Sequence, residues 1–140
     1  MILADTSAWM EYDRATGSAV DIRLTDLIEG DGQLAVTEPV VMEVLAGARD
    51  ELREQQLRRL LRSFQLARLD AASDWEAAAR IYRRCRRVGV TPRGLTDCLI
   101  AAVAWRRRAA LLSYDVDLAR VATVMDIGLD SASLRAQRRG

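Results

Sequence analysis

Four acidic residues have sequence surroundings that suggest a catalytic site. Asp5 directly follows the apolar run 1–4, and Asp115 closely follows a second strand-like run that ends at Leu112 and Ser113. Ligands of open parallel sheets bind beyond the carboxyl ends of the strands, so both aspartates point toward the expected binding edge. Either could instead serve only as a helix N-cap, because aspartate is common at strand-to-helix junctions.

Glu43 and Asp97 each interrupt an apolar helical segment. Glu43 is the only charged residue between positions 40 and 48, and its helical neighbours Val40, Ala46 and Gly47 form an apolar or small face. Asp97 precedes the uncharged run 98–105. A buried carboxylate must be paired, protonated or bound to a cation. The alternatives are an exposed edge of a mostly buried helix for Glu43 and a helix cap for Asp97.

Four carboxylates in one site would repel one another unless a hard cation neutralised them. Magnesium is the expected ion, because it takes oxygen ligands, keeps several waters and can orient a water for attack on a phosphodiester. One of the acids could accept a proton from that water, and the sequence leaves open which one. Asp117 is a possible accessory acid or a surface helix residue. The hydroxyls of Thr6, Ser7 and Ser113 could hold a metal-bound water or a phosphate oxygen. For Ser7, capping of the helix is the simpler role.

The composition excludes several other chemistries. Histidine is absent, which removes the usual general base and the serine and cysteine triads that depend on it. Cys85 and Cys98 have no paired spacing, so we expect reduced packing residues and no disulfide or zinc site. The net charge is +1, but residues 1–50 carry ten acids and three arginines, whereas residues 51–140 carry ten acids and eighteen arginines. Arginine suits phosphate, although a GC-rich genome would also explain the absence of lysine.

The elements that must position these acids alternate between strands and helices. Strands are expected at 1–4, 34–37, 66–69, 109–113 and 127–129. Helices are expected at 6–14, 18–29, 39–48, 51–63, 73–88, 95–108 and 116–125, with a capping box at residues 73–76. Because the helical stretches are too long for hairpins, they imply parallel pairing and an α/β fold, a three-layer α/β/α sandwich around a central parallel sheet.

The chain is expected to form one domain over residues 1–130, followed by a polar, basic and frayed tail over 131–140 that contains Arg135, Arg138 and Arg139. No apolar stretch approaches the roughly 20 residues that span a bilayer, and the first residues are not a basic leader. We therefore expect a soluble, cytoplasmic protein that does not bind membranes.

Taken together, the motifs resemble the PIN-domain family, and specifically the VapC-type toxins of bacterial toxin–antitoxin pairs. The motifs are ILADTSAW at 2–9, EPVVMEVLAG at 38–47, DCLIAA at 97–102 and LLSYDVDL at 111–118. The resemblance implies a PIN-like α/β/α fold and a magnesium- or manganese-dependent endoribonuclease. By position, the family's acidic quartet falls on Asp5, Glu43, Asp97 and Asp115, with Asp117 as an accessory acid and Thr6 or Ser7 as the supporting hydroxyl.

The resemblance also implies partners. Such toxins form homodimers and bind a small VapB-type antitoxin whose C-terminal segment covers the acidic pocket, with an apolar groove offered by helices near the N-terminus. Their targets are often structured RNAs cut in exposed loops, where unstacked bases can be recognised. Many relatives have a histidine where this chain has Tyr114, so no role is inferred for that side chain. Candidate contacts to the RNA backbone, or else members of a solvated helix face, are the arginines at 80, 83, 84, 86, 87, 93, 106, 107 and 108.

Single positions argue against two other enzyme classes. A phosphate-accepting receiver domain needs a lysine, which the chain lacks, and a haloacid-dehalogenase-like phosphatase needs an aspartate at the position of Ser7. The remaining alternative is a non-catalytic PIN-like partner-binding module with an idle acidic pocket.

Overall fold

The computed structural model describes residues 1–135 of the 140-residue chain. Within that range, strands and helices alternate as the sequence predicts. The order is β1 (Ile2–Ala4), α1 (Thr6–Asp13), α2 (Ala19–Glu29), β2 (Leu34–Val36), α3 (Glu38–Ala46), α4 (Glu51–Leu61), β3 (Gln65–Leu66), α5 (Asp74–Arg87), α6 (Leu95–Arg107), β4 (Ala110–Leu112) and α7 (Val116–Met125).

The four strands form one parallel sheet in the order β3-β2-β1-β4. Leu3 in β1 lies opposite Ala35 in β2 and Leu111 in β4, and all three side chains are fully buried. Parallel strands that are covered on both faces are continuous apolar runs, which is why these short segments contain almost no polar residue. Since the strands run the same way, the carboxyl ends of β1 and β4 meet at one edge of the sheet.

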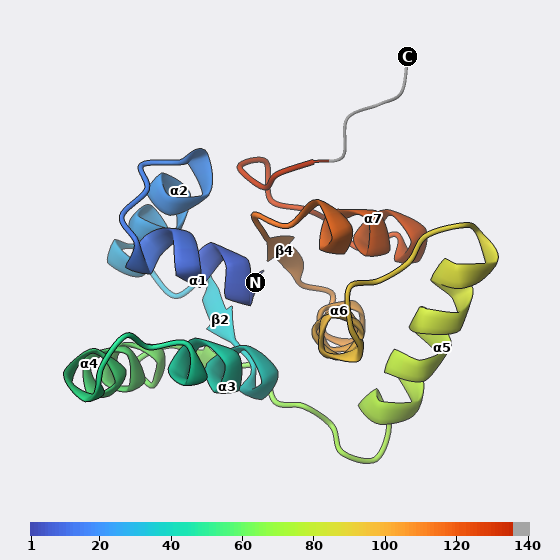
Figure 1. Cartoon of the computed structure of the whole chain (residues 1–140), viewed down its shortest axis with the longest axis horizontal. Helices are drawn as coiled ribbons and strands as arrows, with labels where there is room; N and C mark the ends of the chain where they lie inside the picture. The colour runs from blue at the N-terminus through green and yellow to red at the C-terminus, as the bar shows by residue number, and fades with distance from the viewer. Residues whose placement is uncertain (136–140) are drawn as a thin grey trace.

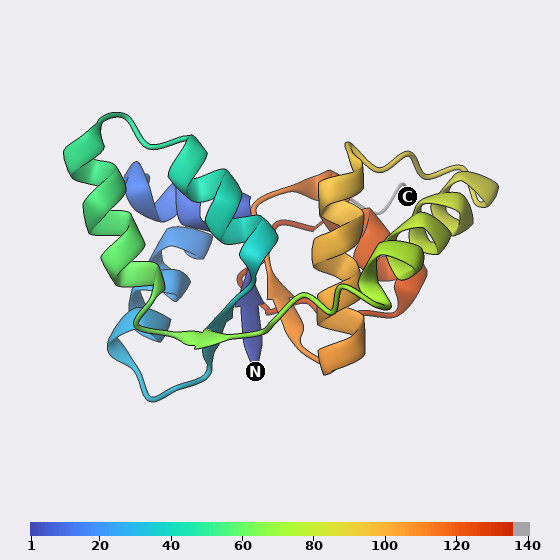
Figure 2. The same cartoon turned by 90° about the horizontal axis from the view of Figure 1, so that it is seen from below.

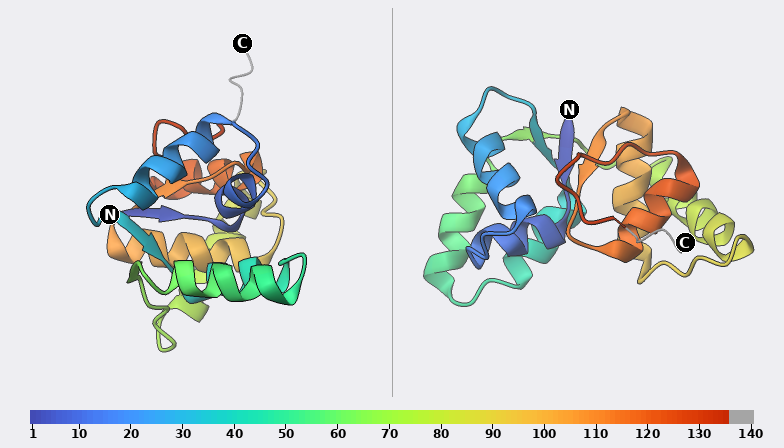
Figure 3. Two further views of the ribbon diagram at one scale, coloured as in Figure 1. Left: turned by 90° about the vertical axis from the view of Figure 1, so that its left-hand side faces the viewer. Right: turned by 90° about the horizontal axis from the view of Figure 1, so that it is seen from above.

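Helices cover the sheet on both sides. Helices α1 to α4 lie to one side of the central strands and α5 to α7 to the other, as Figures 1 and 2 show and the right-hand view of Figure 3 confirms. Helix α6 buries an almost unbroken run from Cys98 to Ala104, and α5 packs against α6 through Ala78, Ile81 and Cys85. The predicted three-layer α/β/α sandwich with a parallel sheet is confirmed.

The outer edge of β4 is covered by the segment that follows α7. Leu111 bonds through its backbone to residues 128 and 130, and the backbone N–H of Leu134 donates to the carbonyl of Ser113 (2.8 Å). The buried Ser133 hydroxyl donates to the carbonyl of Leu111 at 3.0 Å. The strand expected at 127–129 is therefore a single bridge, between Leu111 and Leu129. Packed structure extends past residue 130, and the predicted tail arginines 138 and 139 lie outside the described residues.

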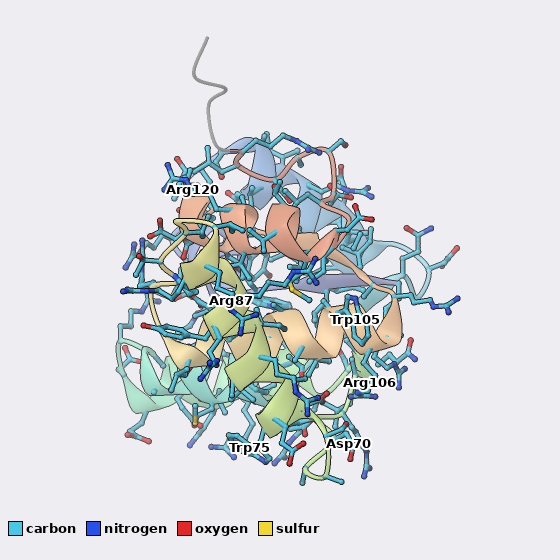
Figure 4. The ribbon with its side chains drawn as sticks, turned by 90° about the vertical axis from the view of Figure 1, so that its right-hand side faces the viewer. Asp70, Trp75, Arg87, Trp105, Arg106 and Arg120 are labelled. Carbon is cyan, nitrogen blue, oxygen red and sulfur yellow. The ribbon has the colours of Figure 1, made fainter. Side chains whose placement is uncertain are left out.

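The capping box expected at residues 73–76 is wrong. Ser73 makes no side-chain cap bond, because its hydroxyl donates instead to the Asp70 carboxylate at 2.7 Å. The carboxylate of Asp74, which is 1 % exposed, accepts two hydrogen bonds from the Arg106 guanidinium, at 3.0 and 2.9 Å. This ion pair ties the start of α5 to the end of α6. Figure 4 labels Arg106 in this part of the molecule, with Asp70 below it. The third strand is also shorter than expected, at Gln65–Leu66.

The remaining expectations concern single side chains and the membrane. Cys85 and Cys98 are buried free thiols, as predicted. Trp9 is fully buried in the core, whereas Trp75 and Trp105 are more than half exposed. None of the helices within residues 1–135 has the length and apolar character needed to cross a bilayer.

Candidate active site

The structure brings the four predicted acids to one cavity. Asp5, Glu43, Asp97 and Asp115 all line a cavity of about 390 Å³ at the carboxyl edge of the sheet. Each acid comes from a different place in the chain: the end of β1, the middle of α3, the first turn of α6 and the loop after β4. The fold thus converts four acids that are distant in sequence into neighbours.

Asp5 is held in place by three hydrogen bonds. Its carboxylate accepts from the backbone N–H of Ala8 at 2.9 Å, from the Ser7 hydroxyl at 2.7 Å and from the Ser113 hydroxyl at 2.6 Å. Only 3 % of Asp5 is exposed. Asp5 is therefore both the N-cap of α1 and a wall of the cavity, so the two roles that the sequence left open coexist.

The two serines join the ends of β1 and β4. The Ser7 hydroxyl accepts from the backbone N–H of Tyr114 at 2.8 Å, and the Ser113 hydroxyl accepts from the backbone N–H of Asp115 at 3.1 Å. Each serine therefore receives one hydrogen bond from the loop after β4 and donates one to Asp5. This network fixes the position of the Asp5 carboxylate relative to the backbone that carries Asp115.

Glu43 is positioned by Thr6. The Thr6 hydroxyl, in the first turn of α1, donates to the Glu43 carboxylate at 2.6 Å. The expectation that Glu43 lies on a buried helix face is wrong in part. Val40 is fully buried, but Ala46 and Gly47 are exposed, so Glu43 lies at the border of the buried face and faces the cavity.

The electrostatics of the cavity disfavour its own negative charges. Burial raises the pKa of Asp5 from 3.8 to about 6, although its three hydrogen bonds oppose the shift. Burial also raises the pKa of Asp97 from 3.8 to about 6, reinforced by the charges of Asp115, Asp5 and Glu43 and opposed by Arg93. Asp97 accepts no hydrogen bond within residues 1–135. A nearby cation would lower both pKa values, because it favours the ionised form.

Arg93 contributes a positive charge to the lining of the cavity. Its guanidinium lies 3.6 Å from the Asp115 carboxylate and 3.3 Å from that of Asp117, while 69 % of its side chain stays exposed. Arg120 also contacts Asp117, at 3.2 Å. Asp117 does not line the cavity, so its link to the site runs through Arg93 and through its own backbone N–H, which donates to Asp115 at 2.9 Å.

Comparison with known proteins identifies the family. The family model for the PIN domain matches residues 2–124. Ribonuclease VapC11 of Mycobacterium tuberculosis is 43 % identical over 136 residues, which cover 96 % of this chain and all of that protein. The chain belongs to the PIN-domain family, among the VapC ribonucleases.

Solved structures agree with the PIN fold. VapBC2 from Rickettsia felis, bound to a DNA fragment from its promoter, superimposes with a TM-score of 0.66 at 16 % identity, over 97 % of this chain and 98 % of that one. FitAcB from Neisseria gonorrhoeae superimposes with a TM-score of 0.69 at 19 % identity, over 94 % of this chain and 98 % of that one. At these identities, the likeness concerns the fold.

The donor set of the PIN-domain cavity fits a hard divalent ion. Every acidic group that lines it offers oxygen, which magnesium prefers. Within the described residues, no three acidic side chains stand close enough to form a closed set of metal ligands. Magnesium characteristically binds through one or two carboxylates and keeps several waters. An open arrangement of acids is therefore compatible with magnesium, whereas an ion that needs a full set of protein ligands would not fit it.

Sequence reasoning missed two charged residues of the cavity wall, Glu11 and Arg14. Both lie on α1 or at its end, four and seven residues after Ser7, and this spacing places them on the same helical face. The Glu11 carboxylate, which is nearly buried, accepts from the Thr16 hydroxyl at 3.0 Å. Helical periodicity counted from Ser7 would have found both residues.

Proposed function

We propose that this PIN-domain protein is a magnesium-dependent endoribonuclease that acts as the toxin of a toxin–antitoxin pair. The observation that carries the proposal is the meeting of Asp5, Glu43, Asp97 and Asp115 in one cavity, where the pKa of two of them is raised to about 6. Carboxylates that repel one another destabilise the fold unless some are protonated or a cation neutralises them, and a divalent ion would do so with all four ionised.

In this proposal, the ion lies among the four carboxylates, which bind it either directly or through the waters that it keeps, and manganese is an acceptable substitute. When bound, magnesium supplies a Lewis acid for the phosphodiester and orients a water for attack. The surrounding hydroxyls fix the ligands, since Ser7 and Ser113 orient Asp5 and Thr6 orients Glu43. The exposed fork of Arg93 can donate to a phosphate oxygen at the rim, because guanidinium groups bind phosphate through paired N–H donors.

The test of catalysis is cleavage of RNA by the purified protein with magnesium. Activity should disappear when EDTA is added and return with excess magnesium or manganese. Asp5→Asn and Asp97→Asn should each lower the rate at least about a hundredfold, as expected for the loss of a ligand that positions the reacting groups. Glu51→Gln, an exposed carboxylate in the first turn of α4, is the matched control and should retain full activity. EDTA-resistant cleavage, or aspartate variants with full activity, would refute the proposed metal site, whereas no cleavage by the wild type with magnesium would leave the non-catalytic partner-binding module.

We propose a small VapB-type antitoxin as the partner. The R. felis structure is of a VapBC pair, and a further structure with the same fold is a toxin–antitoxin complex from Klebsiella pneumoniae. Between α3 and α4, this chain has an apolar groove of about 370 Å³, next to the helix that carries Glu43. Its apolar lining includes Val41, Met42, Leu45, Leu61 and Phe64.

The groove can be tested with the product of a short reading frame next to this gene. Expression of this chain alone should arrest growth, and co-expression of the small protein should relieve the arrest. Met42→Glu places a charge on an exposed groove residue and should abolish co-purification with the small protein, whereas Ile22→Glu, at a similarly exposed position on α2, should not. Equal behaviour of the two variants would exclude the groove as the binding site.

The homodimer and the choice of structured RNA are further parts of the proposal. Analytical ultracentrifugation of the purified chain should give the mass of two copies. Sequencing of RNA ends after brief induction should place the cuts in loops rather than in paired stems, because recognition of RNA sequence favours unstacked bases. Cuts distributed along paired stems would contradict a preference for exposed loops.

A further inference from the structure

Helix α5 presents a row of arginines to solvent. Its inner face packs through Ala78, Ile81 and Cys85. At 100° per residue, the opposite face carries residues 80, 83, 84 and 87, and all four are exposed. The set consists of Arg80, Arg83, Arg84 and Arg87, which we call the α5 arginine face.

Most of this positive charge is not neutralised. Within the described residues, only Arg80 of the four has an ion-pair partner, Glu76, at 3.7 Å, with both side chains largely exposed. Such exposed pairs contribute little. The stretch 74–93 contains six arginines and two acidic residues, a net charge of +4 on a chain whose total is +1. A concentrated field of one sign attracts a polyanion.

The α5 arginine face leads toward the acidic cavity. The C-terminal end of α5 and the loop that follows it lie at the same edge of the molecule as the first turn of α6, which carries Asp97 (Figure 2). Arg93 belongs to this loop and lines the cavity. Figure 4 looks onto α5 and shows Arg87 near its C-terminal end, on the side where Arg120 of α7 also lies.

We propose that the α5 arginine face binds the phosphate backbone of the RNA substrate and guides one strand past Arg93 into the cavity. The inference rests on the proposed ribonuclease function. From residue 80 to residue 87 the helix rises about 10 Å, over which one strand of a duplex carries about three phosphates. Four exposed guanidinium forks therefore match the length and the charge of a short piece of backbone.

A second copy of this chain is a poor occupant of the same face. In a two-fold symmetric dimer, the same patch on each copy faces its equivalent, so the arginines would meet arginines. An RNA backbone instead offers the opposite charge along the whole helix. The predicted homodimer is therefore expected to form through another surface.

The test is RNA binding by the full chain in EDTA, measured by fluorescence anisotropy with a labelled RNA stem-loop over a range of salt concentrations. Arg84→Gln/Arg87→Gln should weaken binding roughly tenfold at low salt and should reduce the slope of log K against log salt by about 1.4, or about 0.7 for each phosphate that is no longer neutralised. In cleavage assays, the KM should rise while kcat remains unchanged, because the two arginines bind the ground state and the transition state equally.

Two control variants isolate the α5 arginine face. Arg59→Gln/Arg68→Gln removes the same charge from exposed arginines that have no ion pair within residues 1–135, and it should change the slope little. Arg84→Lys/Arg87→Lys keeps the charge and should retain the slope. Equal effects of the two glutamine variants would show that net charge alone matters and would overturn the inference.

Other outcomes also decide the matter. If Arg84→Gln/Arg87→Gln altered the mass of the protein in solution, or weakened the binding of duplex DNA but not of RNA, the face would serve a different partner and the inference would be wrong. If the wild type cleaves RNA and this variant behaves as the wild type does, only the inference fails. If the wild type does not cleave RNA with magnesium, the proposed function itself fails.

Discussion

Replacing Asp97 by asparagine should stabilise the metal-free protein while it destroys activity. The pKa of Asp97 is raised from 3.8 to about 6, mainly by burial and then by Asp115, Asp5 and Glu43. A raised carboxyl pKa means that the folded protein holds its proton more tightly than the unfolded chain does. The stability that Asp97 contributes is therefore fully present below about pH 4 and is lost as the pH rises through about 6.

The size of the effect follows from the same shift. Two pKa units correspond to about 3 kcal/mol, and partial exposure of Asp97 roughly halves that figure through solvent screening. Asparagine also gives up the favourable interaction of a carboxylate with the first turn of α6, about 0.3–1 kcal/mol. The net gain expected for Asp97→Asn at pH 7 is about 1 kcal/mol, or roughly 3 °C in melting temperature.

The assay is urea and thermal unfolding of the wild type and Asp97→Asn in EDTA from about pH 3.5 to about pH 7.5. The difference between them should be smallest near pH 4 and should grow up to about pH 6. Magnesium should raise the stability of the wild type at pH 7 and have much less effect on the variant. Glu51→Gln, which removes a first-turn carboxylate from α4, should lose a few tenths of a kcal/mol with no such pH window. An Asp97→Asn protein that was less stable than the wild type at pH 7 in EDTA would refute the reasoning.

Three further predictions concern the residues that support the site and the fold. Ser113→Ala removes the hydroxyl that donates to Asp5 at 2.6 Å, so the pKa of Asp5 should rise further and the acid limb of the cleavage profile should move to higher pH; an unmoved profile would contradict the role of this bond. Thr6→Val frees the Glu43 carboxylate and should lower the cleavage rate about tenfold with less than about 1 kcal/mol of change in unfolding free energy, whereas Thr6→Ser should retain both. Arg106→Ala leaves the buried Asp74 carboxylate unpaired and should cost about 3 kcal/mol in urea unfolding, whereas Arg107→Ala should cost much less.

The parts of the fold that could be predicted from the sequence are those that local pattern determines. The alternation of apolar strands with helices specified the parallel sheet, since long connections exclude hairpins. The position of Asp5 and Asp115 after strands specified their common edge. The positions of Glu43 and Asp97 were found because a lone carboxylate in an apolar helix needs a polar neighbour.

The sequence could not reveal contacts that depend on tertiary structure. The residues 73–76 have the pattern of a capping box, but Asp70 and Arg106 take the polar groups that would form it. Arg106 lies 32 residues from Asp74, so no local rule connects the two. The hydrogen bonds of Ser7 and Ser113 also depend on tertiary structure, because the two serines meet only once β1 and β4 are paired. The third strand was misplaced because its two residues are both exposed and carry no alternation.

The segment after α7 has a consequence for how this protein can associate. It occupies the hydrogen-bonding positions along the outer side of β4, while the opposite border of the sheet, β3, is only two residues long. Within residues 1–135, neither β4 nor β3 offers an extended row of free peptide groups with which another strand could pair. The described sheet therefore gives a partner little opportunity to bind by adding a strand, which favours recognition through side chains.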